Sequence, residues 1–328
     1  MRGLRRTLHP AWYQGTDSRP PYFEGWYFKL VDPTERHRIA VIPGILKAAD
    51  SAASHAFVQV LDGSSGVATY HRYPPEAFHS SEESFDIRVG DSRFSLERLR
   101  LAIRSGERSL SGQLDFVELK PWPVRLASPG VMGWFAWVPF LRTYHGVLSF
   151  DHVIEGSLAL DGEVIDFQTG RGYIEKDWGR SFPDAWIWTQ TNHFDPAGTS
   201  LTASIATIPF LGTDFRGFII GLRHLDHLYR FATYTGARIE ELGFEEGVVH
   251  IVVADRRQRL EIVARSANTG VLRGPTGLDM TGRVPESLDG EVSIRLSATA
   301  AGRSTPIYSG RGRNAGVEMV GDLRQLLT

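Results

Sequence analysis

The sequence predicts an all-β protein whose antiparallel strands form barrels or sandwiches. Apolar and polar residues alternate over many short segments, which is the periodicity of half-buried strands. Gly, Asp, Asn and Pro punctuate these segments at regular spacing. Only one short stretch, "GDLRQLL" at 321–327, is helical in character. Many short strands separated by turn signals are typical of a sandwich or a barrel.

The expected strands of the N-terminal half are joined by recognisable tight turns. A "DGSSG" turn at 62–66 makes a hairpin, Gly90 and Asp91 form a second turn, and Asp161 with Gly162 forms a third. Residues 71–84 carry Pro and Ser and are expected to form a loop. The predicted strand segments are 26–31, 38–46, 55–73, 85–103 and 156–170.

The C-terminal half continues the same pattern. A tight turn at Asp255 and Arg256 divides one long alternating segment into two strands. The Gly- and Pro-rich stretch 265–290 is expected to be a loop. The predicted strand segments are 185–194, 200–208, 215–225, 228–236, 247–266, 290–298 and 315–320.

Length and a faint internal echo suggest two similar β domains. The chain has 328 residues, of which 42% are hydrophobic, and this is enough for two cores. The stretches "DSRPPYFEGWYFKLVD" and "WGRSFPDAWIWTQTN" each place a Phe, an acidic residue and a Trp-x-aromatic pair at the start of a strand. We expect one domain over residues 1–170 and a second over 171–328.

Charge and cysteine content exclude several classes of protein. The formal net charge is −2, whereas a nucleic-acid binder shows a concentrated basic face. The chain has no cysteine, which excludes disulfides and thiolate chemistry. The basic N-terminus lacks the apolar segment and cleavage site of a secretory signal, so a cytoplasmic protein is the expectation.

One apolar run, "VMGWFAWVPFL" from Val131 to Leu141, allows two interpretations. It is too short to span a bilayer. We favour a buried strand or a lid, because short apolar runs are commonly buried. The alternative is a peripheral contact with a membrane surface through Trp134 and Trp137, because indole rings suit that interface.

The densest chemistry of the sequence lies in two aromatic and charged motifs. Alternation along a strand places Glu24, Trp26 and Phe28 on one face, with Tyr27 and Lys29 on the other. The same rule gives the second motif a face with two indoles followed by two carboxamides, which suits a small-molecule site. The residues of that face are Trp186, Trp188, Gln190 and Asn192.

A purely structural interpretation of both motifs stays open. Aromatic residues in strands are most often core. Glu175, Lys176 and Asp177 could form a salt-bridged corner, or Glu24 and Lys176 could be a buried pair joining the two halves. His145 is expected to be a hydrogen-bonded residue at a barrel rim or part of the site. No metal-binding spacing such as HxH or HExxH occurs, so no metal is expected.

Four segments together resemble the tocopherol cyclase family. They recur in order along nearly the whole chain, and the first two are the most specific. This resemblance implies two lipocalin-like β-barrels in tandem, related to carotenoid hydratase-type proteins. The segments are "YFEGWYFK" at 22–29, "YIEKDWGRSFPDAWIWTQTN" at 173–192, "LEIVARSANTGVLRGPTG" at 260–277 and "AGVEMVG" at 315–321.

The resemblance implies an isomerase that closes a chromanol ring without a cofactor. An acid protonates the nearest trisubstituted alkene of a prenylated quinol, and the phenolic oxygen adds to the tertiary cation. A donor of this kind has to stay protonated in a dry, apolar cavity, where aromatic faces stabilise the cation. On this basis Glu24 or Glu175 is the expected donor and Asp177 a substitute donor, while Lys176 holds or tunes a carboxylate. Expected substrate contacts come from Trp26, Trp178, Trp186, Trp188, Gln190, Asn192 and His145.

Two departures from the family pattern leave the substrate open. Plant members have Asn where this chain has Asp177, and Cys where it has Thr191. The leading hypothesis is a cyclase, or a related isomerase or hydratase, for a lipophilic prenylated substrate. A second hypothesis is a non-catalytic binding protein for an isoprenoid or pigment. A third is a membrane-adjacent interaction module using Trp134 and Trp137.

Overall fold

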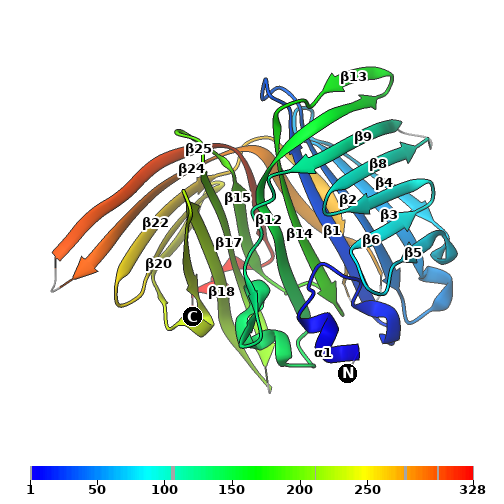
Figure 1. The fold of residues 1–328 in the computed structure, drawn as a ribbon. Coiled ribbons are helices and arrows are strands. Elements are labelled where there is room, and N and C mark those ends of the chain that lie inside the picture. Colours follow the sequence, from blue (N-terminus) through cyan, green and yellow to red (C-terminus); the bar gives the residue numbers. More distant parts are fainter. Residues whose placement is uncertain (1, 105–107, 211, 277–278, 301–302, 328) are drawn as a thin grey trace. The chain divides into compact units, whose positions relative to one another are not determined.

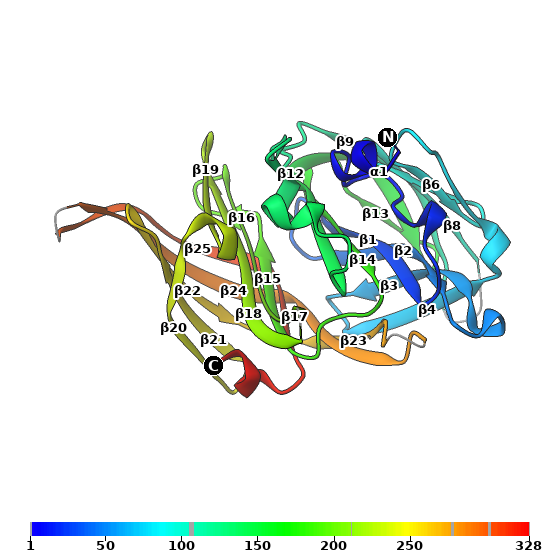
Figure 2. The same cartoon turned by 90° about the horizontal axis from the view of Figure 1, so that it is seen from below.

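The structure, a computed structural model, is dominated by two large antiparallel sheets (Figures 1 and 2). It describes residues 2–104, 108–210, 212–276, 279–300 and 303–327. Contacts divide the chain into two compact units: residues 1–182 with 270–284, and residues 183–269 with 285–328. The predicted all-β class with two antiparallel β units is therefore confirmed.

The first unit contains a twelve-stranded sheet in the order β4-β3-β2-β1-β14-β12-β9-β8-β7-β6-β5, with β13 paired to β12. Figure 1 shows β14 between β1 and β12, so the strand of this sheet that comes last in the sequence pairs with the strand that comes first. The strands are β1 (Tyr22–Val31), β2 (Arg38–Lys47), β3 (His55–Asp62), β4 (Val67–Tyr73), β5 (Phe78–Ser80), β6 (Asp86–Val89), β7 (Ser92–Ser95), β8 (Arg98–Ile103), β9 (Leu110–Val117), β12 (Thr143–Leu160), β13 (Glu163–Asp166) and β14 (Gly170–Gly179).

Aromatic rings fill the core of the first unit. Alternation along β1 directs Trp26 and Phe28 into this core, and both are fully buried. The ring of Trp26 stacks on Phe85 at 5.6 Å, and Phe28 lies 5.8 Å from Phe94 and 6.0 Å from Phe116. Ring pairs at this spacing add to the stabilisation from burial. The interior that we expected to resemble a lipocalin cavity is thus occupied by side chains around Trp26.

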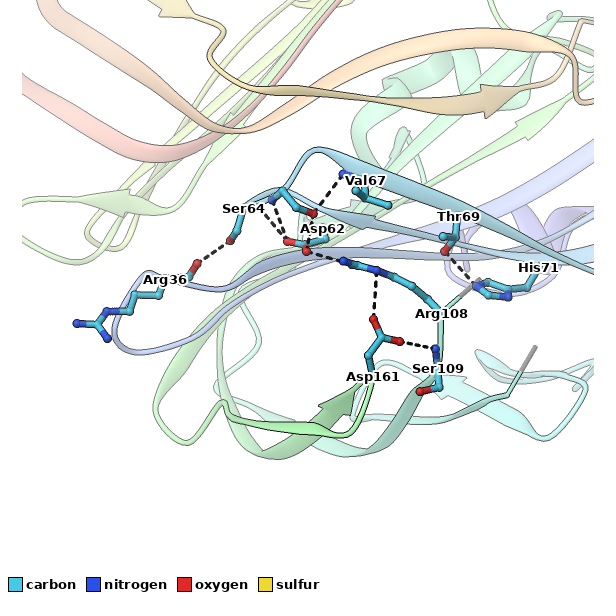
Figure 3. A network of polar contacts seen from close by, with 10 residues as sticks. Arg36, Asp62, Ser64, Val67, Thr69, His71, Arg108, Ser109 and Asp161 are labelled. Atoms are coloured by element: carbon cyan, nitrogen blue, oxygen red, sulfur yellow. Dashed lines mark hydrogen bonds and ion pairs between the residues drawn. The ribbon is translucent and has the colours of Figure 1, made fainter. Parts of the chain in front are cut away.

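A polar cluster fastens two predicted turns of the first unit to each other (Figure 3). Arg108 donates at 3.0 Å to Asp62, the last residue of β3, and pairs at 3.4 Å with Asp161, in the turn before β13. Burial raises the pKa of Asp62, but hydrogen bonds from Ser65 and Arg108 outweigh it and lower the pKa overall. The hairpins predicted at 62–66 and at Asp161 are confirmed.

The second unit is built on an eleven-stranded antiparallel sheet, in the order β19-β18-β17-β15-β25-β24-β22-β21-β20. β16 pairs with β25, and β23 pairs with the beginning of β24, but residues 270–284, which include nearly all of β23, belong to the first unit by their contacts. The core of this unit is mainly aliphatic, with Phe194, Phe218 and Phe231 among its buried members. The strands are β15 (Trp186–Thr191), β16 (His193–Phe194), β17 (Thr199–Phe210), β18 (Thr213–His224), β19 (His227–Ala232), β20 (Arg238–Glu245), β21 (Val248–Ala254), β22 (Gln258–Arg265), β23 (Thr269–Gly274), β24 (Gly282–Ala300) and β25 (Arg303–Val320).

Short helices and a small ribbon complete the described part of the chain. β10 pairs with β11, and the one α-helix among the described residues, α1, precedes β1. None of the helices in the described ranges has the length and apolar character that crossing a membrane requires. The bounds are α1 (Arg2–Thr7), η1 (Gly15–Asp17), η2 (Ser51–Ala53), η3 (Pro75–Ala77), η4 (Gly130–Trp137), η5 (Thr233–Thr235), η6 (Leu323–Leu326), β10 (Val124–Arg125) and β11 (Ser128–Pro129).

Several local expectations differ from the structure. Contacts change from one unit to the other after Phe182, and not after residue 170, because β14 pairs with β1 and β12. The expected loop at 265–290 contains β23 and the beginning of β24, and the expected loop at 71–84 contains η3 and β5. The expected C-terminal helix is a four-residue 3₁₀ turn, η6. In the stretch 265–290, pairing with neighbouring strands overrides the local composition of Gly and Pro, which favours turns.

The apolar run from Val131 to Leu141 is not a strand. Its first part forms the 3₁₀ segment η4, which is kinked at Gly133, where φ is 59°. Val131 and Leu141 are buried, whereas Trp134 is 49% exposed and Phe140 is 60% exposed. The segment therefore anchors its two ends in the first unit and presents two large apolar side chains to solvent.

We expect Phe28→Ala to destabilise the protein by about 3–5 kcal/mol, because it leaves a cavity inside the aromatic core. Urea unfolding followed by tryptophan fluorescence measures the change. Val164→Ala is the matched control, because Val164 is 69% exposed and its truncation should leave the unfolding midpoint in place. Equal midpoints for Phe28→Ala and the wild type would contradict the packing described above.

Candidate active site

The motif around Glu24 and the sequence Glu175-Lys176-Asp177 lie side by side, because β1 pairs with β14. On the face toward the core, Glu24 lies opposite Trp178, and Trp26 lies opposite Lys176. On the other face, Tyr27 lies opposite Glu175. Directly opposed residues of an antiparallel pair share a face. The sequence Glu175-Lys176-Asp177 is therefore not a single corner, because Lys176 points away from its two acidic neighbours.

Glu24 and Lys176 form a fully buried ion pair on the core face. Lys176 Nζ lies 2.6 Å from Glu24 Oε1, and neither side chain has solvent exposure. The backbone N–H of Gln14 donates to both oxygens of Glu24, at 2.9 and 3.0 Å, and the Tyr22 hydroxyl also donates to this carboxylate. Both residues belong to the first unit, so the pair does not join two halves.

Lys176 also holds the segment that precedes β1. Its Nζ donates to the carbonyl oxygens of Pro10 at 2.9 Å and Trp12 at 2.5 Å. The same ammonium lies 4.8 Å from the ring centroid of Trp26 and 4.6 Å from that of Trp178. Burial lowers the pKa of Lys176 to about 8, while Glu24 acts in the opposite direction. These contacts offset the cost of burying the positive charge of Lys176 in an apolar core.

A second polar cluster, consisting of His145, Tyr173, Glu175 and Asp177, lies on the opposite face of β14. The β12–β14 register places His145 opposite Asp177. His145 Nδ1 lies 2.9 Å from Asp177 Oδ1, and its Nε2 lies 3.7 Å from Glu175 Oε2. Tyr173 Oη donates to Glu175 Oε2 at 2.5 Å. The imidazole thus bridges two carboxyl groups, one of them buried.

The electrostatics of this His145 cluster favour a bound proton. Burial by itself lowers the pKa of His145, but the carboxylates of Asp177 and Glu175 outweigh it and raise the pKa to about 9. The imidazole is therefore cationic at neutral pH, and it carries a proton beside a dry carboxyl group. Ligand atoms of His145, Glu175 and Asp177 lie within 4.8 Å of one another, which is also a spacing that suits a metal ion. In the structure these atoms contact each other, as a proton network requires.

The second unit places its predicted aromatic face away from its own core. Ile187 and Val317 belong to the core, whereas Trp188 is opposite Glu318 on the other face. Trp186 Nε1 donates to Glu318 Oε2 at 2.5 Å. Gln190 continues this face and is buried. Asn192 is buried too, but it lies just beyond the end of β15.

Three polar residues near these clusters were not predicted. Tyr173 is two residues before Glu175 on the same strand, so alternation was a sufficient signal for it. Glu318 lies in a strand that we predicted, but its neighbour Trp186 is 132 residues away. Glu286 is fully buried opposite Glu318, in a segment that we expected to be a loop. Only strand pairing brings the last two together.

Similarity searches give the family of this lipocalin-like, all-β protein. The family model described as tocopherol cyclase-like matches residues 115–321, which is more than half of the chain. The chain therefore belongs to the tocopherol cyclase-like family.

Curated relatives match a shorter part of the chain. A chloroplastic tocopherol cyclase of Zea mays is 30% identical over 149 residues, which are 44% of this chain and 31% of the relative. A probable chloroplastic tocopherol cyclase of Oryza sativa subsp. japonica is 29% identical over 149 residues, which are 44% of this chain and 32% of the relative. The match thus spans about a third of the length of either relative, and it is not a match to a whole enzyme.

A solved structure supports the architecture. The crystal structure of CghA with Sch210972 superposes with a TM-score of 0.56 and covers 92% of this chain and 89% of its own. Sequence identity is only 10%, so the likeness shows the fold alone.

We expect Lys176→Met to lower the free energy of unfolding by about 3–5 kcal/mol, because it leaves the Glu24 carboxylate buried without its cation. Chemical denaturation measures this loss. The matched control is Arg311→Met, which removes an exposed ion pair with Glu291 and should barely change stability. If both variants lost a similar amount of stability, the buried carboxylate of Glu24 would not depend on the Lys176 ammonium, and the prediction would be wrong.

We expect the imidazole of His145 to titrate near pH 9, well above its ordinary value of 6.5. Its protonation therefore stabilises the fold fully below pH 6.5, and this contribution is lost as the pH rises through about 9. Histidine NMR titration measures the midpoint. His152 is an internal reference, because burial, with a smaller effect of Arg171, lowers its pKa to about 3. The midpoint should fall in Asp177→Asn, and an unchanged midpoint there would contradict the assignment.

Proposed function

We propose that this protein is a cofactor-independent, acid-catalysed cyclase, or a closely related isomerase or hydratase, for a lipophilic prenylated phenol. The observation that carries this proposal is the protonated His145 bridging Glu175 and Asp177 in a partly buried cluster. Membership of the tocopherol cyclase-like family supports ring closure as the reaction. The same two facts favour an enzyme over a simple carrier, because binding alone needs no stored proton.

The proposed reaction uses the His145 cluster as both donor and acceptor of one proton. A proton from the cluster forms a C–H bond with one alkene carbon, which leaves a tertiary cation at the other. The phenolic oxygen then forms a C–O bond with this cation, and its own proton returns to the cluster. No electrons are gained or lost, so proton transfer and orientation account for the chemistry.

We propose Glu175 as the group that hands the proton to the alkene. It is buried beside the protonated imidazole of His145, from which its carboxylate takes up a proton before passing it to the alkene. Asp177 is then a positioning residue, because it holds Nδ1 of that imidazole. Glu24 is the poorer candidate, because Lys176, Gln14 and Tyr22 already donate to its carboxylate.

The aromatic residues divide into two proposed roles. Trp26 and Trp178 flank the Lys176 ammonium, and we assign them to support of that ion pair. Trp186, Trp188, Gln190 and Asn192 belong to the second unit, and we propose that their face of that unit binds an apolar ligand, with the two carboxamides as hydrogen-bonding groups. The bond from Trp186 to Glu318 supports this role, because it fixes the orientation of one indole ring.

We expect Glu175→Gln to lower the rate of ring closure of a prenylated 1,4-hydroquinone by about 10²–10⁴-fold, because the amide cannot donate the required proton. Mass spectrometry measures product formation. In D₂O, the wild-type product should gain one carbon-bound deuterium, which marks the alkene carbon that received the proton.

The matched control is Glu291→Gln, which makes the same chemical change at a partly exposed carboxyl group of the second unit. It should retain wild-type activity. Full activity of Glu175→Gln would exclude Glu175 as the donor. A product without carbon-bound deuterium would exclude alkene protonation by a solvent-exchangeable acid.

We further propose that the protein works in the cytoplasm and contacts a membrane peripherally, where lipophilic substrates partition. The supporting observation is the exposure of Trp134 and Phe140 beside the buried anchor Val131. Trp137 is less suited to this role than the sequence suggested, because its Nε1 donates to the carbonyl of Leu126 at 3.0 Å. Large apolar rings at the surface are typical of interfacial contacts.

We expect the double variant Trp134→Ser/Phe140→Ser to co-sediment with phosphatidylcholine vesicles less than the wild type, because it removes the exposed apolar area of the segment. Binding is measured from the pelleted fraction. The control is Val164→Ser, which changes an even more exposed apolar residue elsewhere in the first unit. Equal sedimentation of the double variant and the wild type would remove the membrane contact from the proposal.

A further inference from the structure

A groove of about 690 Å³ lies in the first unit, between strands β3 and β4 and the residues 271–273 and 280–283. Figure 2 shows β23 on the same side of the first unit as β3 and β4. The groove shares no residue with the His145 cluster or with the Glu24–Lys176 pair. Its volume falls within the range of small-molecule sites. The lining side chains that matter here are Gln59, Tyr70, Arg72, Arg273, Met280 and Arg283.

The buried amide of Gln59 builds one wall of this groove. Gln59 Nε2 donates to the carbonyl of Arg273 at 2.9 Å, and the backbone N–H of Arg273 donates to Gln59 Oε1 at 2.8 Å. These reciprocal bonds link β3 to β23, although the two residues are 214 positions apart. The backbone of Arg273 is therefore held by a buried amide, and this wall of the groove has a defined position.

Positive charge converges on the groove. The guanidinium carbon of Arg273 lies 4.6 Å from the ring centroid of Tyr70, which orders this cation. Burial raises the pKa of Tyr70, while the charges of Arg273 and Arg72 act to lower it and Asp279 acts weakly to raise it. Among the ion pairs of the described residues, none includes Arg72, Arg273 or Arg283. A single nearby acid therefore leaves an excess of positive charge.

Met280 and Tyr70, which line the groove beside these cations, belong to or pack against an apolar cluster. Phe57 and Met280 are buried in it, and Tyr70 packs against them. The ring of Phe57 stacks on Tyr70 at 5.3 Å. Arg72 is partly engaged, because its Nη2 donates to the carbonyls of Ala52 and Ala53 at 3.3 Å. Arg273 and Arg283 are consequently the cations best placed to meet a ligand above an apolar surface.

We propose that this groove binds an amphiphilic organic anion, in which a carboxylate or phosphate group is attached to an apolar chain or ring. Guanidinium groups match the planar, paired oxygen atoms of such anions. Met280 and Tyr70 provide the apolar surface on which the remainder of the molecule is buried. The groove is a binding site in addition to the proposed active site, and it is independent of the reaction proposed there.

The test is titration of the full chain with octyl phosphate by isothermal titration calorimetry. We expect binding that weakens about tenfold or more in Arg273→Gln/Arg283→Gln, because each substitution removes a charge-assisted hydrogen bond. Arg311→Gln is the matched control, because it removes an exposed arginine of the second unit and should leave the affinity unchanged. Melting temperatures of the variants check that the double variant is folded.

Further titrations separate the components of the ligand. Inorganic phosphate and octanol should each bind more weakly than octyl phosphate, and equal binding of either would overturn the amphiphilic assignment. Vesicles of phosphatidylglycerol test whether the anion is a lipid headgroup. If Arg273→Gln/Arg283→Gln loses vesicle or octyl phosphate binding and Arg311→Gln keeps it, the result supports the groove as the binding site. An equal loss of binding in Arg311→Gln overturns that assignment. Glu175→Gln should keep full octyl phosphate binding whatever its effect on catalysis, so the two proposals fail separately.

Discussion

The ion pair between Glu24 and Lys176 is the constraint on which the first unit depends. It connects β1 to β14 inside an apolar core, where an unpaired charge is strongly disfavoured. A slip of one residue in the β1–β14 register would turn Lys176 out of the core and Glu175 into it. The pair thus specifies the register, and the register places Glu175 and Asp177 on the face that carries His145.

Strand β14 separates two kinds of electrostatics on its two faces. On the core face, a lysine ammonium is surrounded by a carboxylate, backbone carbonyls and two indole rings, so its charge is fully compensated. On the other face, one imidazole lies between two carboxyl groups and keeps its proton above neutral pH. Compensation makes the first arrangement structural, whereas the retained proton makes the second suited to acid–base chemistry. Adjacent residues in the sequence therefore have different functions.

The two units use their surfaces in a similar way. Each has a polar cluster on the face of the sheet that points away from that unit's hydrophobic core: the His145 cluster in the first unit, and Trp186 with Glu318 in the second. In the first unit, the core face of the sheet is packed with the aromatic cluster around Trp26. The fold shared with CghA at 10% identity is accordingly a scaffold, and the chemistry depends on the side chains displayed on it.

Alternation and turn chemistry are local properties, so the all-β class, the hairpins at Asp62 and Asp161, and the sorting of Glu24 and Trp26 from Tyr27 and Lys29 could be predicted from the amino-acid sequence. The sequence also indicated Glu175, Asp177 and His145 as polar residues of interest. Only the tertiary structure decided that Glu24 belongs to Lys176, that His145 bridges two acids, and that Glu286 lies opposite Glu318. These relations depend on which distant strands pair. Strand pairing follows from burial over the whole sheet, which no local window of sequence contains.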